Sequence, residues 1–309
     1  MSAPESARES GPRTRRWLPA AALLAVTAVW GSTFVLISDV VVRIPVPDLL
    51  AVRFVLATVV LAAVAGRLLL RADRRLLARG AVLGLLYGAA QFLQTYGLAR
   101  TTPALSGLLT GMYVVLTPVI AAVVFGVRIT RVLAIAVGLA LAGLVVLTTS
   151  GHGLALGSGE LLTLGSAMVY AVHIVALGRW SRASEALVLA TVQSAVIAAV
   201  SVVGALPDGI VLPASGADWL AVGYLAVVAG ALVLLVQTWA QAHLPATRAA
   251  VIMCAEPVWA AVFAVLLTDQ PVTVRLVLGG ALVVAAMAVA DLRPSLRRVS
   301  PAVPGELPR

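Results

Sequence analysis

Charged residues are scarce in this chain, and lysine is missing altogether. Only 11% of the 309 residues are charged, all 22 basic residues are arginine, and aromatic residues make up 5%. A soluble globular domain carries far more charge on its surface, so this composition excludes one. Hydrophobic residues make up 61% of the chain and the mean hydropathy is +1.05, which places the chain in a lipid bilayer.

Cysteine is nearly absent, and so are the common motifs of enzymes. The single cysteine, Cys254, excludes an internal disulfide and a thiolate metal cluster. The sequence has no GxxxxGK[ST] phosphate-binding loop, no metal-binding histidine pair and no nucleophile elbow. We therefore predict no cofactor and no metal site, and we predict that the chain is not an enzyme and does not drive transport with ATP by itself.

Long apolar runs dominate what is present. A membrane-spanning helix needs about 20 mostly apolar residues. On this basis the sequence predicts an all-α integral membrane protein with ten transmembrane helices, at residues 18–38, 49–69, 80–98, 105–127, 132–149, 160–179, 186–206, 219–242, 247–267 and 272–290.

The ten helices are expected to form two units between polar tails. Residues 17–149 are predicted to be a first five-helix repeat, and residues 159–292 a second one. Residues 150–158, SGHGLALGS, form a glycine-rich linker. Residues 1–16 and 293–309 are too polar or too rich in proline to bury a core, so we predict a disordered N-terminal tail and an unstructured C-terminal tail.

One stretch of sequence occurs in both units. Gln94–Pro118 begins with QTY and matches Gln237–Pro257, which begins with QTW, and each stretch ends on a proline inside an apolar helix. Repetition of this kind indicates two copies of one structural unit. Because five is an odd number of helices, the second unit enters the membrane from the opposite side, and the repeat is inverted. Inverted repeats with a binding site near the membrane midplane are a recurrent architecture of secondary transporters.

The arginines predict how the chain is oriented. Arg43, Arg100 and Arg275 lie in loops predicted on one side and Arg53 lies within a span, so the other eighteen of the 22 lie on the opposite side. Positively charged side chains collect on the cytoplasmic side of membrane proteins. Both termini are therefore predicted to be cytoplasmic, and the net charge of +9 reflects orientation and not a nucleic-acid partner.

Several short segments carry a family resemblance. They are Trp30–Phe34 (WGSTF), Arg53-Phe54, Gly159-Glu160 and Ala255–Val258 (AEPV), together with the repeated stretch. On these segments nearly the whole chain is similar to the EamA-like group of the drug/metabolite transporter superfamily. The resemblance implies a ten-helix secondary carrier, often an exporter of amino acids or other small metabolites, with no nucleotide requirement.

Glu256 is the most informative candidate residue. It lies about nine residues into its predicted helix, roughly 13 Å deep in a core about 30 Å thick. An acid at this depth is costly and is by default a functional group, as a proton carrier or as a ligand for a cationic substrate group. The alternative is a structural acid that is hydrogen-bonded to Gln237 or Gln241.

Prolines interrupt the matching helices of both units. Pro257 leaves the carbonyl of Met253 without its helical donor, and Pro118 does the same to Val114. Paired interruptions in two halves indicate a transporter binding site. The alternative is that both kinks only shape helix packing.

Polar and aromatic side chains on neighbouring helices are predicted to line a cavity. The glutamine pairs Gln91 with Gln94 and Gln237 with Gln241 are three and four residues apart, so each pair shares a helix face. The alternative is that the glutamines bond between helices and the aromatic side chains anchor at the membrane interface. The aromatic candidates are Trp30, Tyr96, Tyr113, Trp239 and Trp259.

Arg53 and His173 complete the candidate set. Arg53 lies near the start of its helix, where it either binds a substrate carboxylate or an acid, or extends outward to the interface. His173 lies in the middle of a span, where it is either a proton relay or a neutral, hydrogen-bonded imidazole.

Together these observations predict a secondary active transporter. We expect it to export small organic metabolites or drugs across the cytoplasmic membrane by alternating access, with proton coupling through Glu256 as the mechanism considered. The alternatives are a non-transporting membrane scaffold or sensor and an intramembrane enzyme that acts on lipid. The expected partners are a small-molecule substrate and the lipid bilayer, and a homodimer is left open.

Overall fold

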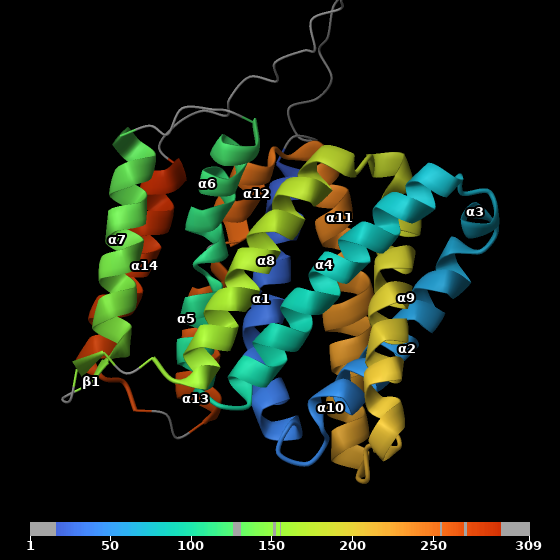
Figure 1. Cartoon of the computed structure of the whole chain (residues 1–309), viewed down its shortest axis with the longest axis horizontal. Coiled ribbons are helices and arrows are strands. Elements are labelled where there is room, and N and C mark those ends of the chain that lie inside the picture. Colours follow the sequence, from blue (N-terminus) through green and yellow to red (C-terminus); the bar gives the residue numbers. More distant parts are fainter. Residues whose placement is uncertain are drawn as a thin grey trace, which may run out of the picture.

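The chain folds into a bundle of long helices that run side by side between two opposite ends (Figure 1). The computed structural model describes residues 17–125, 131–150, 153–154, 156–253, 255–268 and 271–291. Regular structure in these residues is helical, apart from two strands of two residues each, β1 (Thr149–Ser150) and β2 (Gly153–Leu154), which pair antiparallel. Both predicted tails and Cys254 lie outside the described residues.

The helices fall on the apolar runs of the sequence. In the first half they are α1 (Leu18–Val40), α2 (Val46–Ala65), α3 (Arg67–Leu70), α4 (Arg74–Leu98), α5 (Pro103–Thr110), α6 (Tyr113–Phe125) and α7 (Arg131–Thr148). In the second half they are α8 (Ser158–Trp180), η2 (Ala183–Glu185), α9 (Ala186–Ala205), η3 (Leu206–Asp208), α10 (Gly216–Ala226), the π-helical η4 (Val227–Leu232), α11 (Val233–His243), α12 (Ala246–Met253), α13 (Ala255–Leu267) and α14 (Val274–Asp291).

Eight helical segments are long and apolar enough to cross a membrane, judged by length and composition. Two further helices, α7 and α14, contain shorter apolar stretches, Ala134–Gly143 and Val274–Ala286. The prediction of an all-helical, multi-span membrane protein is therefore confirmed. The exact number of ten transmembrane helices stays a prediction.

Polar side chains fix where several helices begin. The side chain of Asp73 accepts a hydrogen bond from the backbone N–H of Leu76 and caps α4, and Thr102 caps α5 in the same way. Ser215 caps α10. These caps satisfy backbone donors that the first helical turn leaves free. They place the helix starts at the two ends of the bundle, outside its apolar middle.

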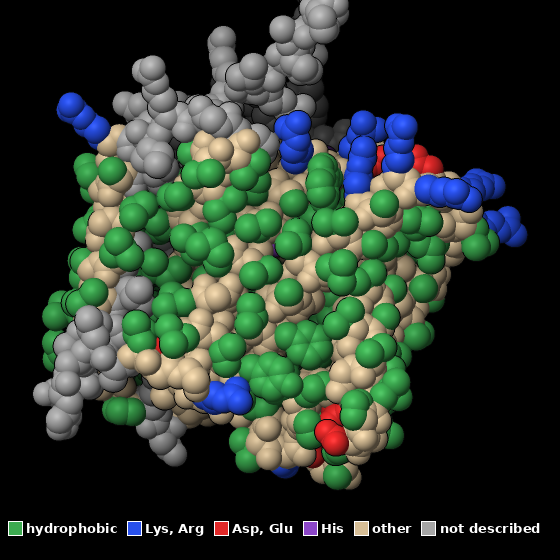
Figure 2. All heavy atoms as spheres, in the orientation of Figure 1, with side chains coloured by type: hydrophobic (Ala, Val, Ile, Leu, Met, Phe, Trp, Pro, Cys, Tyr) green, Lys and Arg blue, Asp and Glu red, His purple; other side chains and the backbone are tan. Residues whose placement is uncertain are grey.

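The outer surface of the bundle is apolar between two polar ends. Hydrophobic side chains cover the wall in Figure 2, and arginine side chains gather along its upper edge. Val59 and Leu85 are more than half exposed although they lie well inside long helices. Large exposed apolar patches mark contact with a membrane or a partner. Together with the apolar helices, this surface fits burial in lipid.

The two halves of the chain interlock and do not form separate bodies. α7 and α14 lie side by side at the left of Figure 1, and α2 packs on α9, α4 on α8 and α1 on α13. Each pair combines one helix from each half. The largest buried apolar cluster likewise takes side chains from helices of both halves, among them α1, α2, α8 and α11. A cavity at the centre of the bundle is therefore lined by both halves.

A stripe of glycines brings α4 close to α9, as small residues do at interfaces between membrane helices. A Cβ atom on Gly80 would meet Val192, and one on Gly88 would meet Ile197. At Gly84 the nearest atoms belong to the backbone of Gln193, at 2.9 Å from the position of such a Cβ atom. Backbone cannot rotate away as a side chain can, so Gly84 is the position where a side chain is least tolerated.

We expect Gly84→Ala to push α4 away from α9 and to lower the free energy of unfolding by about 1–3 kcal/mol, the usual cost of overpacking. Thermal unfolding of the detergent-solubilised protein measures the effect. Gly223→Ala is the matched control, because a Cβ atom there has open space around it. Equal unfolding temperatures for the two variants would show that the close approach of α4 to α9 contributes no stability.

Candidate functional site

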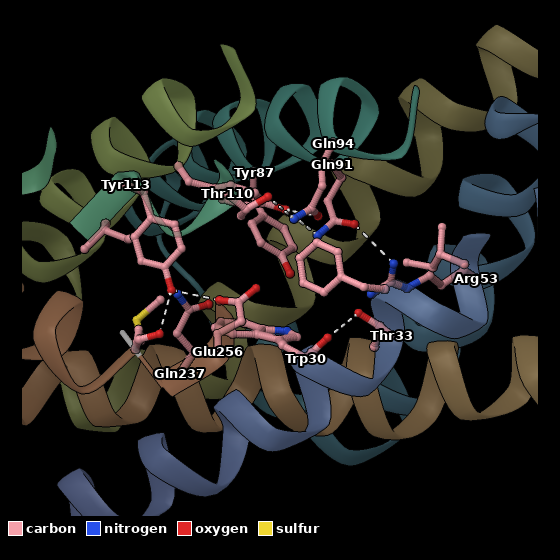
Figure 3. A pocket seen from close by; sticks show the side chains of 15 residues that line it. Trp30, Thr33, Arg53, Tyr87, Gln91, Gln94, Thr110, Tyr113, Gln237 and Glu256 are labelled. Atoms are coloured by element: carbon pink, nitrogen blue, oxygen red, sulfur yellow. Dashed lines mark hydrogen bonds between the residues drawn. The ribbon is translucent and has the colours of Figure 1, made fainter. Parts of the chain in front are cut away.

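A cavity lies among the spans, and its lining comes from both halves of the chain (Figure 3). The space inside it that water-sized molecules could occupy is about 30 Å³, so in this conformation its own side chains nearly fill it. The first half contributes Trp30, Thr33, Phe34, Ile37, Arg53, Tyr87, Gln91, Gln94, Thr110 and Tyr113, and the second half contributes Tyr170, Ile174, Gln237, Met253 and Glu256.

Glu256 and Tyr113 meet on one side of this cavity. The Tyr113 hydroxyl lies 2.8 Å from Oε2 of Glu256 and 3.1 Å from the backbone carbonyl oxygen of Met253. The Met253 carbonyl is the group that loses its helical donor because residue 257 is a proline. The hydroxyl of Tyr113, in the first half, therefore lies within hydrogen-bond distance of two acceptors in the second half, and it has one hydrogen to donate.

A chain of hydrogen bonds starts at Arg53 on the opposite side of the cavity in Figure 3. Nη1 of Arg53 donates to Oε1 of Gln91 at 3.1 Å, and Nε2 of Gln91 donates to the Tyr170 hydroxyl at 2.7 Å. The hydroxyl then donates to Oε1 of Gln94 at 3.0 Å, and Nε2 of Gln94 donates to Thr110 at 3.2 Å. Every donor in the chain points the same way, away from the guanidinium. This network links α2, α4, α8 and α5.

Glu256 and Arg53 are both buried, and neither has an ion-pair partner among the described residues. Their exposed fractions are 5% and 2%. In the part of the chain that the structure describes, no carboxylate forms a salt bridge with Arg53 and no cationic side chain forms one with Glu256. Arg53 instead donates Nε to the carbonyl of Leu225 and lies over the ring of Phe54. Charges that are buried without a counter-charge are costly, so a group that binds in the cavity has an electrostatic reason to bring one.

Most of the predicted cavity residues do lie around the cavity. Trp30, Gln91, Gln94, Gln237 and Glu256 all line it, as does Tyr113. Oε1 of Gln237 has no hydrogen-bond partner among the described residues and is free to accept from a bound molecule. The structural alternative for Glu256 named Gln237 and Gln241 as its partners, and this part was wrong, because Tyr113 supplies the hydrogen bond.

Arg53 also lines the cavity, and of its two alternatives the extension of its side chain to the interface was wrong. Its side chain is buried between α4 and α10, where it bonds to Gln91 and to the carbonyl of Leu225. Depth along the helix, which the sequence gives, does not tell which neighbouring helices cover a side chain. Those neighbours close the route outward that a long side chain would otherwise take.

Tyr96 and Trp239 do not line the cavity, although they occupy matching positions in the repeated stretch. Tyr96 stacks on Phe92, and Trp239 contacts His243. Each lies two residues after a cavity glutamine, which in an α-helix is a rotation of about 200°. The aromatic side chains therefore lie on the far side of their helices. Trp259, 38% exposed, also lies outside the cavity.

Gln241 and His173 pack between helices and not around the cavity. Gln241 donates to the carbonyl of Ile174, and His173 is bonded through Nε2 to Oε1 of Gln193 at 2.8 Å. His173 is fully buried and lies beside the ring of Tyr87. These contacts are those of the neutral, hydrogen-bonded imidazole that was one of the two sequence-based alternatives.

In the first half the helix is interrupted at Gly111 and Met112, between α5 and α6, and Pro118 lies inside α6. Backbone bonds such as Val114 N–H to the Gly111 carbonyl show a tightened turn at the interruption itself. Pro257 lies inside the first turn of α13. Residue 254, between α12 and α13, lies outside the described residues. The prediction that the paired prolines mark a transporter binding site stays a prediction.

Sequence reasoning missed several cavity residues, among them Tyr87, Thr110 and Tyr170. Tyr170 lies at the centre of the hydrogen-bond network and all three are buried. Their position in the sequence could have identified them. Each has a hydroxyl group deep in an apolar run, where it needs a hydrogen-bond partner from another helix.

A separate polar cluster closes one end of the bundle. Arg43 forms salt bridges with Asp39 and with Asp218, both at 2.7 Å, and so joins the end of α1 to the start of α10. The hydrogen bonds from Arg43 to Asp39, and then to Asp218, raise the pKa of the guanidinium. Ser32 and Tyr224 are hydrogen-bonded between the same two helices at 2.9 Å. These contacts hold helices of the two halves together at this end.

The fold and the cavity define a class, the multi-span membrane proteins in which both halves of the chain build one buried polar cavity. The model of the EamA-like transporter family matches residues 17–149 and again residues 157–290. The chain therefore belongs to this family, as the sequence resemblance predicted, and is a membrane transporter.

Two individual proteins are similar to the chain. One is described as an uncharacterized transporter of Archaeoglobus fulgidus (strain ATCC 49558 / DSM 4304 / JCM 9628 / NBRC 100126 / VC-16), which is 29% identical over 214 residues that make up 68% of each chain. The other is a solved structure described as "Crystal structure of protein", with a TM-score of 0.68 and 23% identity, which covers 90% of this chain and 97% of its own. At this identity the second match shows the fold alone.

We expect Arg53→Met to reduce transport about tenfold or more, the usual effect of losing a charged hydrogen-bond donor. We also expect that the variant unfolds no more easily than the wild type. Removal of a buried charge without a counter-charge recovers its desolvation cost, which offsets the two hydrogen bonds that are lost. Transport assays and thermal unfolding on the same preparations measure both effects, with Arg100→Met as the control for an exposed arginine. A large fall in unfolding temperature with normal transport would assign Arg53 a structural role.

Proposed function

We propose that this transporter is a secondary carrier that exports small organic metabolites across the cytoplasmic membrane by alternating access, with protons coupled through Glu256. The observation that carries the proposal is the position of Glu256, buried in a cavity that both halves of the chain line. A binding site between two half-equivalent units is what alternating access requires, because exchange of the two conformations opens the site first to one side and then to the other.

The packing of the helices supports an inverted repeat of five helices and five helices. In such an arrangement α1 corresponds to α8, and α6 corresponds to α13. α1 packs on α13, and its counterpart α8 packs on α6. α7 packs on α14, its own counterpart, and α2 packs on α9 in the same way. These pairs are those expected when a two-fold operation exchanges the halves.

Proton coupling through Glu256 follows from the surroundings of the carboxyl group. In the described residues the group has a hydroxyl donor, Tyr113, but no cationic partner. A carboxyl group in this setting can take up a proton or pair with a cationic group of the substrate, and the two compete for the same site. Competition of this kind is the simplest way in which proton entry drives release of a substrate.

The proposed orientation, with both termini in the cytoplasm, is supported by the arginines at one end of the bundle in Figure 2. The loop that precedes α4 belongs to this end, and η3 belongs to the opposite end.

We expect Glu256→Gln to abolish the dependence of efflux on a proton gradient. A carboxamide has the shape of the carboxyl group, but it takes up no proton near neutral pH and has no negative charge that could pair with a cation. The measurement is efflux of a panel of radiolabelled amino acids, nucleosides and cationic dyes from cells that express each variant at matched membrane levels, with and without a protonophore.

Glu160→Gln is the control for this experiment, because Glu160 caps α8 and bonds to Thr101 outside the cavity. It should transport as the wild type does. If Glu256→Gln transports normally and still responds to the protonophore, the coupling role of Glu256 is wrong. If no compound leaves faster from wild-type cells and an uptake assay also shows no gain, the proposed carrier function itself is rejected in favour of a scaffold or sensor.

The orientation gives a separate prediction, made in a Cys254→Ala background. Arg71→Cys and Asp208→Cys place a thiol at exposed positions at opposite ends of the bundle. We expect a membrane-impermeant maleimide to label Asp208→Cys in intact cells, and to label Arg71→Cys only after permeabilisation. The reverse pattern would place the termini outside.

A further inference from the structure

Helix α10 of the second half is tied to the first half at its beginning and near its end. At its beginning, Oδ1 of Asp218 accepts hydrogen bonds from Nη2 of Arg43 at 2.7 Å and from Nε at 3.0 Å. Near its end, the carbonyl of Leu225 accepts a hydrogen bond from Nε of Arg53 at 3.0 Å. Arg43 follows α1 and Arg53 lies in α2, so both contacts join the two halves of the chain. The end of α1 and the start of α10 lie at the lower end of the bundle in Figure 1.

Apolar side chains of α1 and α10 pack together at this end of the cavity. Phe34 and Ile37 of α1 line the cavity, and they share a buried cluster with Val222 and Leu225 of α10. We call this group the α1–α10 cluster; its other members are Val40, Ile44, Leu49, Leu98 and Ala260, and no member is more than 4% exposed. Because α1 runs from Phe34 and Ile37 toward Arg43, the cluster lies between the cavity and the Arg43–Asp218 ion pair. It closes the cavity toward this end.

A substrate can enter this cavity only if helices around it move apart. Water-sized molecules could occupy about 30 Å³ of it, which is enough for a few water molecules and not for a metabolite. Helix α10 is suited to move separately from the rest of its span, because the π-helical segment η4 joins it to α11. Segments of this kind are found at kinks and at functional sites of long helices.

We propose that α10 is the gate of the transporter at this end of the bundle, that the Arg43–Asp218 ion pair holds the gate closed, and that the pair separates whenever the cavity opens to this side of the membrane. Arg43 and Asp218 are then gate residues and not ligands of the substrate. The inference rests on the proposed alternating access, and it adds which helix moves and which contact resists the movement.

Arg43 provides a matched control, because it forms two ion pairs of the same length. Both measure 2.7 Å, but Asp218 belongs to the second half of the chain, whereas Asp39 lies one turn before Arg43 at the end of α1. Movement of α10 therefore breaks the pair with Asp218 and leaves the pair with Asp39 intact. The side chain of Asp218 is 7% exposed and that of Asp39 is 66% exposed, so water and salt weaken the pair with Asp218 less.

The gate is tested by the reactivity of a thiol placed in the α1–α10 cluster. Ile37→Cys is made in the full-length Cys254→Ala protein. Its modification by a membrane-impermeant maleimide is measured in intact cells or inside-out vesicles, whichever exposes Asp208→Cys at the same end. Residue 37 is 4% exposed, so its thiol reacts mainly while the gate is open. The rate of modification therefore reports the population of the open state.

We expect Asp218→Asn to raise this rate about three- to fivefold, the shift in a two-state equilibrium that the loss of one ion pair near the surface produces. Asp39→Asn should leave the rate unchanged, because it breaks no contact between the two halves. Asp218→Glu keeps the negative charge and should keep the low rate. Leu83→Cys, a buried position on α4 outside the α1–α10 cluster, is measured beside Ile37→Cys and should react equally slowly in every variant.

Val222→Cys, on α10 itself, is the second probe position if Ile37→Cys does not fold. Equal rates for Asp218→Asn and Asp39→Asn overturn the proposal, and so does an equal rise at Leu83→Cys, which would show a general loosening of the bundle. If neither probe reacts in any variant, this end does not open and the gate is rejected. The test needs no substrate, so the gate can fail while transport stands. The expected labelling in a chain that moves no compound would reject the carrier and leave the gate.

Discussion

Lipid offers no hydrogen-bond partner to a polar group, and most of the structure follows from this constraint. Hydroxyl groups in the spans turn back onto their own helices, as Thr58 does to the carbonyl of Phe54 and Thr191 to that of Leu187. Larger polar groups cannot satisfy themselves in this way and need a second helix. Arg53, Gln91 and Tyr170 meet at the centre of the bundle for this reason. Polar groups that find no hydrogen-bond partner within their own helix therefore gather around the cavity.

The repeated stretch places matching residues on matching helix faces in the two halves. Gln94 and Gln237 are the matching residues and both line the cavity, whereas Tyr96 and Trp239 match and both lie away from it. The rotation of about 200° between residues two positions apart separates the two roles in each copy. Equivalent residues therefore keep equivalent surroundings although the copies differ in sequence. This supports the reading of the halves as versions of one unit, with the polar face of each turned to a common centre.

Hydropathy was sufficient to predict an all-helical membrane protein, because an apolar run of sufficient length indicates a membrane-spanning helix. It could not predict the partner of Glu256, since Tyr113 lies 143 residues away in the sequence. Contacts between helices depend on rotation and tilt, and many arrangements bury the same apolar residues equally well. The same limit left two alternatives open for Arg53, because the sequence gives its position along the helix but not the helices that cover it. Pro118 lies inside α6, and the helix interruption of the first half lies before it, at Gly111 and Met112.

The acid occurs in only one of the two copies, and the two positions differ in their surroundings. Thr117 and Glu256 each precede the proline of their copy. Thr117 bonds to the carbonyl of Tyr113 in its own helix at 2.7 Å and does not line the cavity. Glu256 lines the cavity and takes its hydrogen bond from Tyr113 in the other half. The two halves therefore contribute differently at this point: the second half supplies the carboxyl group and the first half supplies its hydrogen-bond donor. Under the proposed coupling, the site carries one proton or one cationic group at a time.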